Sequence, residues 1–169
     1  MSKSDALFPG ITVESKREYS ADWYTPQSIF KALNLSFDLD PASPGKEVAP
    51  WIPAKRHFTI LEDGMSRAWS GVVWMNPPYG KHTAEWMYRF MDHCNGVALV
   101  QARTDTRWFQ ACARRSGVIC FISGRIRFVR GVGSGESSCA PLASVLFACG
   151  GKCVDAVCKS NLGFCVSPI

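Results

Sequence analysis

The sequence contains no long hydrophobic run, although 47% of its 169 residues are hydrophobic. No apolar stretch approaches the ~20 residues that a membrane-spanning helix needs, and residues 1–5 lack the apolar core of a signal peptide. With 20% charged residues, the composition is typical of a globular protein of ordinary size. We therefore expect a cytoplasmic protein.

Cysteine pairs of the kind that bind metals are also missing. None of the eight cysteines belongs to a Cys-x-x-Cys pair. Cys149, Cys153 and Cys158 come nearest to the spacing of zinc ligands, but no histidine lies near them in the sequence. Without a signal peptide, and with enough chain for an ordinary core, we expect reduced thiols rather than disulfides, and no bound metal.

A strong excess of charge of one sign is absent as well. The chain has 19 Lys and Arg residues against 14 Asp and Glu residues, a net charge of +5 at pH 7. This balance permits nucleic-acid binding without requiring it. We see no internal repeat and no second region of distinct composition. The sequence therefore predicts a flexible N-terminal arm over residues 1–18, followed by a single domain over residues 19–169.

What the sequence does contain is a short apolar run that ends in a proline-rich loop. Residues 72–75 read Val-Val-Trp-Met, which is typical of a buried strand, and Asn76-Pro77-Pro78-Tyr79-Gly80 follows. Because proline cannot donate to a strand ladder, the strand must end at Asn76, which the next proline restricts to extended geometry. The sequence thus predicts a rigid loop at the carboxyl end of a strand, where open α/β sheets bind ligands.

The chemistry of this loop favours a planar substrate that carries an amino group. Asn76 offers a side-chain carbonyl oxygen, the prolines leave backbone carbonyls without local N–H donors, and Tyr79 offers a flat ring. Two acceptors beside a ring suit a base such as adenine. The alternative is a Pro-Pro turn after a core strand, with Tyr79 as a packing residue.

The order of the elements predicts an α/β fold with a mostly parallel sheet. Leu35, Phe37 and Leu39 alternate with polar residues, as in a strand with one apolar side. We expect an antiparallel C-terminal strand pair at the sheet edge, formed by residues 125–129 and 142–148 around a Gly/Ser-rich loop. We make no prediction for residues 150–169. Further strands are expected over residues 58–60, 97–100 and 117–122, and helices over residues 26–33, 82–95 and 108–113.

Two residues that precede the apolar run over residues 72–75 are expected at the end of a helix or strand. Thr25 precedes Pro26 and can cap the helix that this proline opens. Asp40 ends the first strand beside a turn of small residues, where a carboxylate suits a cationic, amine-bearing cofactor; the alternative is a turn-forming role. The irregular segment over residues 41–58 has the length typical of a functional loop.

Six motifs occur in order along the chain: Trp23-Tyr24-Thr25-Pro26, Phe37-Asp38-Leu39-Asp40, Asp63-Gly64 followed by Trp69, Asn76-Pro77-Pro78-Tyr79-Gly80, Ala102–Phe109 and Gly124–Phe128. Together they resemble the phage-type DNA N-6-adenine methyltransferases, the small Dam-like enzymes, over about residues 20–148. The resemblance implies a Rossmann-like methyltransferase fold, S-adenosylmethionine as the cofactor, DNA with a flipped adenine as the substrate, and a phage or prophage protein in a bacterial host cell.

The resemblance also implies roles for individual residues. One departure from the larger methyltransferases is a lower glycine content in the loop that runs from Asp40 to Gly45. The implied catalytic residues are Asn76, Pro77, Pro78 and Tyr79. The implied cofactor-binding residues are Trp23, Thr25, Pro26, Asp38, Asp40, Pro41, Ala42, Asp63 and Asn76.

Five cations are candidates to hold DNA phosphates or to fill the gap that a flipped adenine leaves. The alternative for each is ordinary solvated surface charge. The loop over residues 131–138 is a candidate for base contacts, and the absence of a separate recognition domain favours a short or relaxed target sequence. The sequence indicates no oligomeric state. The five cations are Lys81, Arg103, Arg125, Arg127 and Arg130.

Other functions use similar residues. Methylation of cytosine N4, of RNA or of a protein glutamine employs a loop of the same kind, and a non-catalytic DNA-binding module would keep the fold without turnover. Methylation of the cytosine ring is disfavoured, because its nucleophile is a cysteine that follows a proline, and no cysteine of this chain does.

Overall fold

The computed structural model describes residues 23–168, so the predicted arm over residues 1–18 lies outside the described residues. The centre of the fold is a seven-stranded sheet. In spatial order its strands are β2 (Ala54–His57), β1 (Phe37–Asp40), β3 (Val73–Met75), β4 (Gly96–Gln101), β8 (Ser144–Cys149), β5 (Val118–Ile122) and β9 (Gly163–Val166).

Most strands of this sheet run in one direction. β2, β1, β3 and β4 pair in parallel. β8 is antiparallel to both of its neighbours, β4 and β5, so that β5 has the same direction as β4. β9 is antiparallel to β5 and forms the far edge. The predicted α/β class with a mostly parallel sheet is therefore confirmed.

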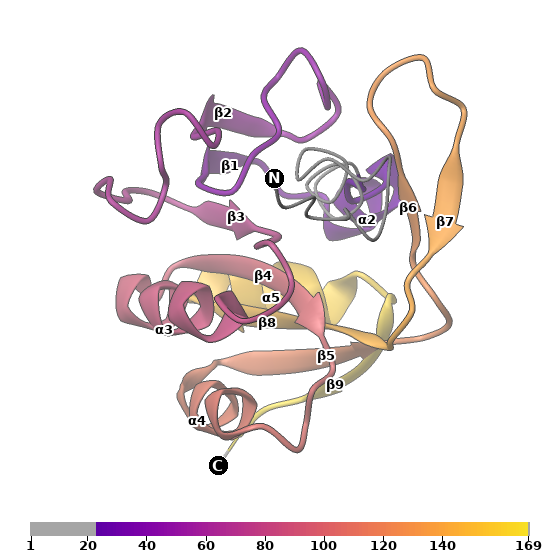
Figure 1. The fold of residues 1–169 in the computed structure, drawn as a ribbon. Coiled ribbons are helices and arrows are strands. Elements are labelled where there is room, and N and C mark those ends of the chain that lie inside the picture. The colour runs from indigo at the N-terminus through magenta and orange to yellow at the C-terminus, as the bar shows by residue number, and fades with distance from the viewer. Residues whose placement is uncertain (1–22, 169) are drawn as a thin grey trace, which may run out of the picture.

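The helices of the described chain cover both faces of the sheet (Figure 1). α3 (Thr83–His93) and α4 (Arg107–Arg115) lie on one face, and α2 (Gln27–Leu33) and α5 (Gly151–Lys159) lie on the other. Three of the four coincide with predicted helices to within two residues at each end. Between residues 23 and 168, no helix has the length and apolar character needed to cross a membrane.

The sheet separates two hydrophobic cores, because successive side chains of a strand point to opposite faces. Trp74 packs on the α2 side against Phe30, with ring centroids 4.7 Å apart, whereas Val73 and Met75 pack on the α3 side. All three residues of β3 are at most 1% exposed. Burial on both faces explains why this strand appears in the sequence as an unbroken apolar run.

The alternation predicted for the first strand is wrong after Phe37. Phe37 packs in the core on the α2 side, but Leu39 packs in the core on the α3 side. The backbone N–H groups of Asp38 and Leu39 both donate to the carbonyl of Val72, at 2.7 and 3.3 Å. Two consecutive donors on one acceptor are the pattern of a β-bulge, which turns the following side chains to the other face.

The predicted antiparallel strand pair at the sheet edge is also wrong. β8 lies inside the sheet, and all six of its residues are buried. The other predicted partner contains β6 (Arg127–Val129), which pairs instead with β7 (Ser137–Cys139) in a separate two-stranded ribbon beside the sheet (Figure 1). β7 is exposed along its whole length, so no apolar alternation marks it in the sequence.

Two further corrections concern cap and strand positions. Thr25 does not cap α2, because Pro26 is the N-cap residue and no side chain donates or accepts a capping hydrogen bond. Residues 58–60 do not form a strand, since pairing occurs earlier, in β2. β2 carries the exposed Lys55 and Arg56, and such charges are a common protection of edge strands that hides them from a hydrophobic pattern.

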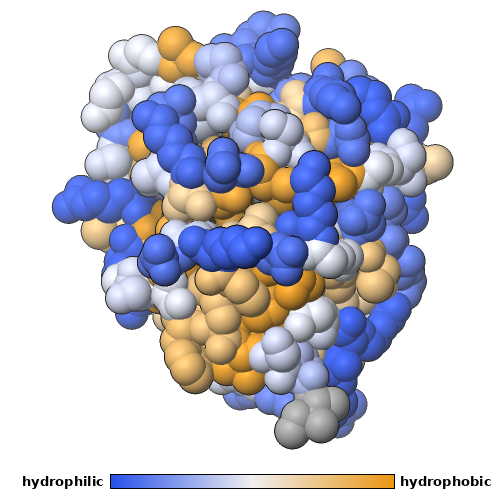
Figure 2. Space-filling model, turned by 180° about the vertical axis from the view of Figure 1, so that it is seen from behind, coloured by the Kyte–Doolittle hydropathy of each residue, from blue (hydrophilic) through white to orange (hydrophobic). Residues whose placement is uncertain are grey.

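The C-terminal residues, for which the sequence predicts nothing, form α5 and the edge strand β9. Seen from behind, the molecule shows an apolar area in the lower half of an otherwise largely hydrophilic surface (Figure 2). Phe164 of β9 is 72% exposed, which is unusual for a large hydrophobic side chain in a strand. The two edges of the sheet thus differ in character, one charged and one apolar.

Candidate functional site

A pocket of about 910 Å³ opens where the carboxyl ends of β1 and β3 meet. From β1 the sheet extends to β2 on one side and to β3 on the other, so these ends form a topological switch point, where open α/β sheets bind ligands. Loops after β1, β2 and β3 and the β6–β7 ribbon supply most of the walls.

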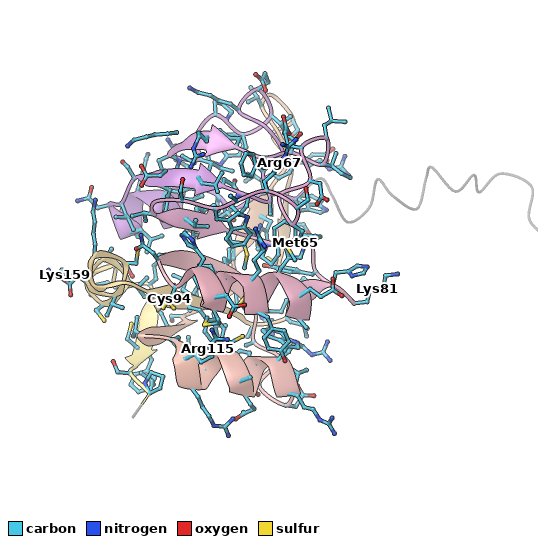
Figure 3. The ribbon with its side chains drawn as sticks, turned by 90° about the vertical axis from the view of Figure 1, so that its left-hand side faces the viewer. Met65, Arg67, Lys81, Cys94, Arg115 and Lys159 are labelled. Atoms are coloured by element: carbon cyan, nitrogen blue, oxygen red, sulfur yellow. The ribbon has the colours of Figure 1, made fainter. Side chains whose placement is uncertain are left out.

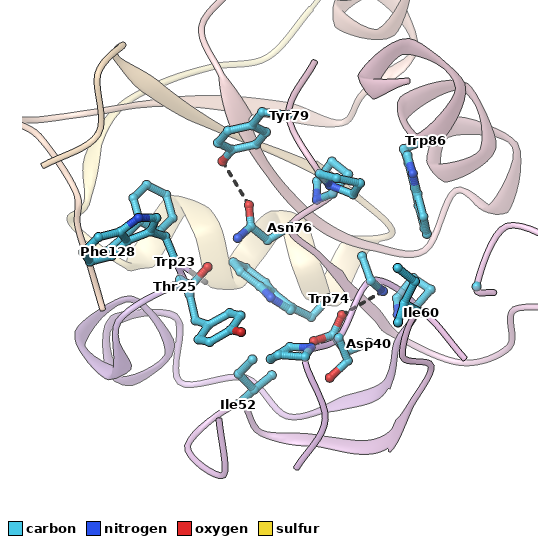
Figure 4. A pocket seen from close by; sticks show the side chains of 18 of the residues that line it. Trp23, Thr25, Asp40, Ile52, Ile60, Trp74, Asn76, Tyr79, Trp86 and Phe128 are labelled. Carbon is cyan, nitrogen blue, oxygen red and sulfur yellow. Dashed lines mark hydrogen bonds between the residues drawn. The ribbon is translucent and has the colours of Figure 1, made fainter. Parts of the chain in front are cut away.

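The loop after β3 places an amide and a phenol together at the centre of this pocket (Figure 4). Tyr79 Oη donates a hydrogen bond of 2.9 Å to Asn76 Oδ1. Burial raises the pKa of the Tyr79 hydroxyl, which therefore stays a neutral donor. The loop is anchored to α3, because the backbone N–H of Gly80 donates to Thr83 Oγ1 at 2.9 Å. The prediction that this loop lies at the carboxyl end of a strand is confirmed.

Asp40 supplies a buried carboxyl group at the end of β1. It is only 2% exposed, and burial raises its pKa to about 7, although the backbone N–H of Ala42 donates to Asp40 Oδ1 at 3.1 Å. None of the ion pairs within the described residues involves Asp40. A pocket carboxyl group that lacks a cationic partner is suited to a positively charged ligand.

Thr25 brings an unpartnered hydroxyl group to the same pocket. Its side chain is 1% exposed, and Thr25 Oγ1 has no hydrogen-bond partner in the structure. A buried polar group without a partner costs about 1–3 kcal/mol, so a bound ligand that reaches Thr25 Oγ1 gains part of this free energy. Trp51 Nε1 donates to the backbone carbonyl of Thr25 at 2.9 Å and fixes its position.

The far ends of the pocket are aromatic or aliphatic (Figure 4). Ile60 and Trp86 lie at one end, and Trp23 and Phe128 lie at the other. Behind Trp86, the ring of Trp69 stacks at a centroid distance of 6.1 Å and an interplanar angle of 26°. The sequence places none of Ile60, Trp86 and Phe128 in the site, because each is an ordinary apolar residue within its own element or loop.

The indole of Trp69 also holds the loop that follows β2. Trp69 Nε1 donates to the carbonyl of Gly64 at 2.8 Å, and the guanidinium of Arg89 lies 5.0 Å from the centre of the Trp69 ring. Gly64 packs so closely that a Cβ atom there would lie 1.9 Å from the carbonyl oxygen of Pro41. Only glycine fits this contact, which brings Asp63 to the pocket wall.

Most of the residues expected at the cofactor line one continuous pocket, but two do not. Pro26 is the N-cap of α2 and lies outside the lining. Asp38 also lies outside it: its carboxylate accepts hydrogen bonds from Lys55 Nζ and from the backbone N–H of Val72, both at 2.8 Å. The hydrogen bond from Lys55 is the main cause that lowers the Asp38 pKa. Expected residues that do line the pocket are Trp23, Thr25, Asp40, Pro41, Ala42, Asp63, Asn76, Pro77, Pro78 and Tyr79.

The five cations expected at DNA lie outside the pocket lining. Lys81 projects beyond the N-terminal end of α3 (Figure 3). Arg103, Arg125 and Arg127 are exposed. Arg130 is half-buried and engaged: its Nε lies 3.0 Å from Glu136 Oε2, and its guanidinium lies 5.2 Å from the centre of the Trp23 ring.

The cysteines make no metal site in the part of the chain that the structure describes. All eight are free thiols, and over residues 23–168 no three His, Cys, Asp or Glu side chains converge as ligands. Cys139 lines the pocket, and the other seven lie elsewhere.

Comparisons with known proteins found a family model and a relative that match the chain. The family model described as DNA N-6-adenine-methyltransferase (Dam) matches residues 12–151. A DNA N-6-adenine-methyltransferase of Haemophilus phage HP1 (strain HP1c1) is 27% identical over 118 residues, which are 63% of this chain and 65% of that protein. The match thus spans slightly less than two thirds of the relative. No solved structure matches the chain.

Proposed function

Because the chain belongs to the DNA N-6-adenine-methyltransferase (Dam) family, we propose that it methylates the exocyclic N6 amine of adenine in DNA, with S-adenosylmethionine as the methyl donor. We further propose that its sheet is a Rossmann-like methyltransferase core. The observation that carries the proposal is the convergence of Asn76, at the end of β3, and the unpaired Asp40, at the end of β1, on one pocket.

The pocket has the groups that S-adenosylmethionine requires. The cofactor supplies a methyl group on a positively charged sulfur when it is bound. Asp40 offers a negative charge without a cationic partner, and Thr25 Oγ1 offers a hydrogen-bonding group without a partner. A volume of about 910 Å³ lies within the range of cofactor sites and leaves room for a base beside the cofactor.

Asn76 and Pro77 would activate and aim the adenine amine. The nitrogen lone pair of adenine is delocalised into the ring, which makes the amine a poor nucleophile. Asn76 Oδ1 and the carbonyl of Pro77 would accept its two N–H groups and localise the lone pair. Reacting atoms held about 3–3.5 Å apart can recover roughly 7–11 kcal/mol of the barrier in favourable cases. No strong general base is needed, since the amine becomes acidic as the new bond forms.

Tyr79 would contact the adenine with its ring and orient the Asn76 amide with its hydroxyl group. Its ring faces the pocket and would stack on an extruded adenine, a contact worth about 1–3 kcal/mol in comparable complexes. Its hydroxyl group donates to Asn76 Oδ1, which fixes the amide with its oxygen available. Because a carbonyl oxygen has two lone pairs, Asn76 can keep this bond and still accept an adenine N–H.

DNA would approach the pocket from the solvent. An adenine inside a duplex cannot reach Asn76, so it must be flipped out at a cost of a few kcal/mol. The exposed cations Lys81, Arg103, Arg125 and Arg127 are proposed phosphate contacts. Given the family and its phage relative, we infer a phage or prophage protein that acts in the bacterial cytoplasm.

The decisive test is mass spectrometry of nucleosides from the DNA of cells that express the chain. N6-methyladenine should appear with the natural sequence and disappear with Asn76→Ala, whereas binding of the cofactor, followed by calorimetry, should stay near normal. Retained methylation in Asn76→Ala would remove this side chain from the mechanism.

A second assay separates the alternative acceptors. Tritiated S-adenosylmethionine, offered with DNA, RNA and protein in separate reactions, should label DNA alone, and the label should be in adenine rather than cytosine. Cofactor binding without transfer to any acceptor would support a non-catalytic DNA-binding module.

A further inference from the structure

Three cysteines in the C-terminal part of the chain form a group that the pocket does not use. Cys120 lies in β5, Cys158 in α5 and Cys165 in β9, and none of them lines the pocket. Lys159, the neighbour of Cys158, lies on the opposite side of the molecule from Lys81, which follows the loop after β3 (Figure 3). The group is therefore separate from the proposed active site.

Cys120 and Cys165 stand directly opposite each other in the ladder between β5 and β9. Further along the same ladder, the N–H of Ser123 donates to the carbonyl of Leu162 at 2.9 Å. Hydrogen-bonded and non-hydrogen-bonded pairs alternate along an antiparallel ladder. Ser123 and Leu162 are thus a hydrogen-bonded pair, and Cys120 and Cys165 stand three residue pairs further along the ladder. Cys120 and Cys165 therefore form a non-hydrogen-bonded pair.

This kind of pair has the right spacing for a disulfide. In non-hydrogen-bonded pairs the Cα atoms lie about 4.5 Å apart, and a disulfide needs a Cα separation of roughly 4.4–6.8 Å. Cys120 and Cys165 can therefore be joined without displacement of either strand. The separation expected of such a pair thus falls inside the range of ordinary disulfides.

Cys158 connects this pair with the solvent. Cys120 is fully buried, Cys165 is half-buried and Cys158 is exposed. Cys165 Sγ lies 3.9 Å from the carbonyl oxygen of Val157, the residue before Cys158. Burial, and in addition the neighbouring Cys165 thiol, raises the pKa of both Cys120 and Cys158, as expected for three thiols that lie close together. The three sulfur atoms thus form a path from the surface to the buried side of β5.

We propose that Cys120 and Cys165 are a reversible disulfide site, and that Cys158 is the thiol through which small-molecule disulfides such as oxidised glutathione reach it. The Cys158 thiolate attacks one sulfur of the external disulfide, whose S–S bond breaks and releases one thiol. Cys165 then attacks the Cys158 sulfur and releases the second thiol. Finally Cys120 attacks Cys165, and Cys158 leaves as a thiolate that takes up the proton of Cys120.

In the net reaction, two protein thiols lose two electrons and the external disulfide is reduced to two thiols. Burial raises the pKa of the Cys158 thiol above its ordinary value of 9.0 and that of Cys120 to about 12. Since the thiolate is the attacking species, exchange is slow at neutral pH and accelerates as the pH rises. The product ties the edge strand β9 to its neighbour β5.

The test uses the full-length, reduced protein and oxidised glutathione at pH 8, with alkylation and peptide mass mapping over time. We expect a peptide that links Cys120 to Cys165, and we expect Cys158→Ser to slow its formation at least tenfold. Cys94→Ser is the matched control, because it also removes an exposed thiol, and it should change the rate less than twofold. Cys165→Ser should leave Cys158 in a stable mixed disulfide with glutathione.

Two results would overturn the proposal. One is glutathione on Cys158 without any Cys120–Cys165 link at equilibrium. The other is an equal rate in Cys158→Ser and the natural protein, which would mean that the buried pair is oxidised through local unfolding. Both readouts concern thiols alone, so they do not depend on whether the chain methylates DNA. A melting curve of each variant shows whether it remains folded.

Discussion

Tyr79 has a second role at the scale of the single residue, because its hydroxyl group is bonded to the amide that would bind the substrate. From the sequence, only the flat ring suggests a function. The structure adds a hydrogen bond of 2.9 Å from Tyr79 Oη to Asn76 Oδ1. Loss of the hydroxyl should therefore reduce the rate moderately, whereas loss of the ring should reduce it much further.

We expect Tyr79→Phe to lower kcat about 2- to 13-fold, since a neutral hydrogen bond contributes about 0.5–1.5 kcal/mol. Tyr79→Ala should cost a further 5- to 160-fold or so, because a stack worth about 1–3 kcal/mol is lost too. Tyr88→Phe, on the exposed side of α3, is the control and should have no effect. Initial rates of methyl transfer to DNA measure all three. If Phe and Ala were equally damaging, the ring would not stack on the base.

Asp40 should make cofactor binding depend on pH. Its pKa of about 7 means that the carboxyl group is mostly protonated at pH 6 and mostly ionised at pH 8. A positively charged cofactor binds the ionised form, so its affinity should rise about tenfold between these values. Calorimetric titrations at pH 6, 7 and 8 measure the change. Asp40→Asn should bind more weakly at pH 8 and show a flat profile.

Ionisation of Asp40 should favour cofactor binding but lower the free energy of unfolding. The folded pKa of Asp40, about 7, lies above the ordinary value of 3.8, so the folded state holds its proton more tightly than the unfolded state. The contribution of Asp40 to the free energy of unfolding therefore decreases as the pH rises from about 4 to 7, and stays low above that. In the absence of cofactor, Asp40→Asn should consequently raise the melting temperature at pH 8.

The structure places in the pocket those predicted site residues that follow a strand end directly. Asn76 and Asp40 both line the pocket, because the position of a strand end is a local property. Asp38 was expected beside them and is bound to Lys55 and Val72 instead. The bulge at Asp38 and Leu39 depends on the neighbouring strand, which a pattern within one strand does not reveal.

At the scale of the element, α3 and the loop after β2 act as one unit through Trp69. The indole stacks on Trp86, which lines the pocket, and donates to Gly64, which packs on Pro41. Trp69 does not line the pocket itself. We therefore expect it to act as a positioning residue for the pocket wall near Trp86 and Asp63, where the proposed cofactor would bind.

Substitutions of Trp69 should therefore raise the KM for S-adenosylmethionine and leave kcat nearly unchanged. Trp69→Phe keeps the stack and loses the bond to Gly64, so we expect a 2- to 13-fold increase, equivalent to about 0.5–1.5 kcal/mol. Trp69→Leu should have a larger effect. Steady-state kinetics with each substrate varied in turn separates the two parameters. A fall in kcat with an unchanged KM would contradict a positioning role.

The β6–β7 ribbon carries two arginines whose surroundings differ. Arg127 is exposed, whereas Arg130 is held by Glu136 and lies over Trp23 in the pocket wall. We expect Arg127→Ala to reduce the slope of log K against log salt for DNA binding by about 0.9, as for one lost phosphate contact. Arg130→Ala should weaken cofactor binding instead. Arg114→Ala, on α4, is the control, and fluorescence titrations with duplex DNA at several salt concentrations measure the slopes.

The elements that the sequence predicted correctly are those with strong local signals. The helices α2, α3 and α4 and the strands β3, β4 and β5 have regular apolar patterns and clear ends. β7 and β2 lack such patterns, because one is polar and the other is charged. The position of β8 between β4 and β5 depends on pairing between segments that are distant in sequence. No local sequence pattern indicates this pairing.

At the scale of the whole molecule, the two edges of the sheet differ in charge and in apolar character. Lys55 and Arg56 at the β2 edge oppose pairing with another strand. The β9 edge, Gly163-Phe164-Cys165-Val166, has no charge and no proline, and Val166 is 39% exposed next to the more exposed Phe164. An unprotected apolar edge favours association with strands of other chains.

We therefore expect Phe164→Lys to suppress concentration-dependent association. The substituted side chain is mostly solvent-exposed, so the free energy of unfolding should change by no more than about 0.5 kcal/mol. Light scattering at increasing protein concentration measures association, and thermal melts measure stability. Val132→Lys, at an exposed position in the ribbon loop, introduces the same charge away from the β9 edge and should leave the scattering unchanged. Equal effects of the two substitutions would attribute the change to net charge and not to the edge strand.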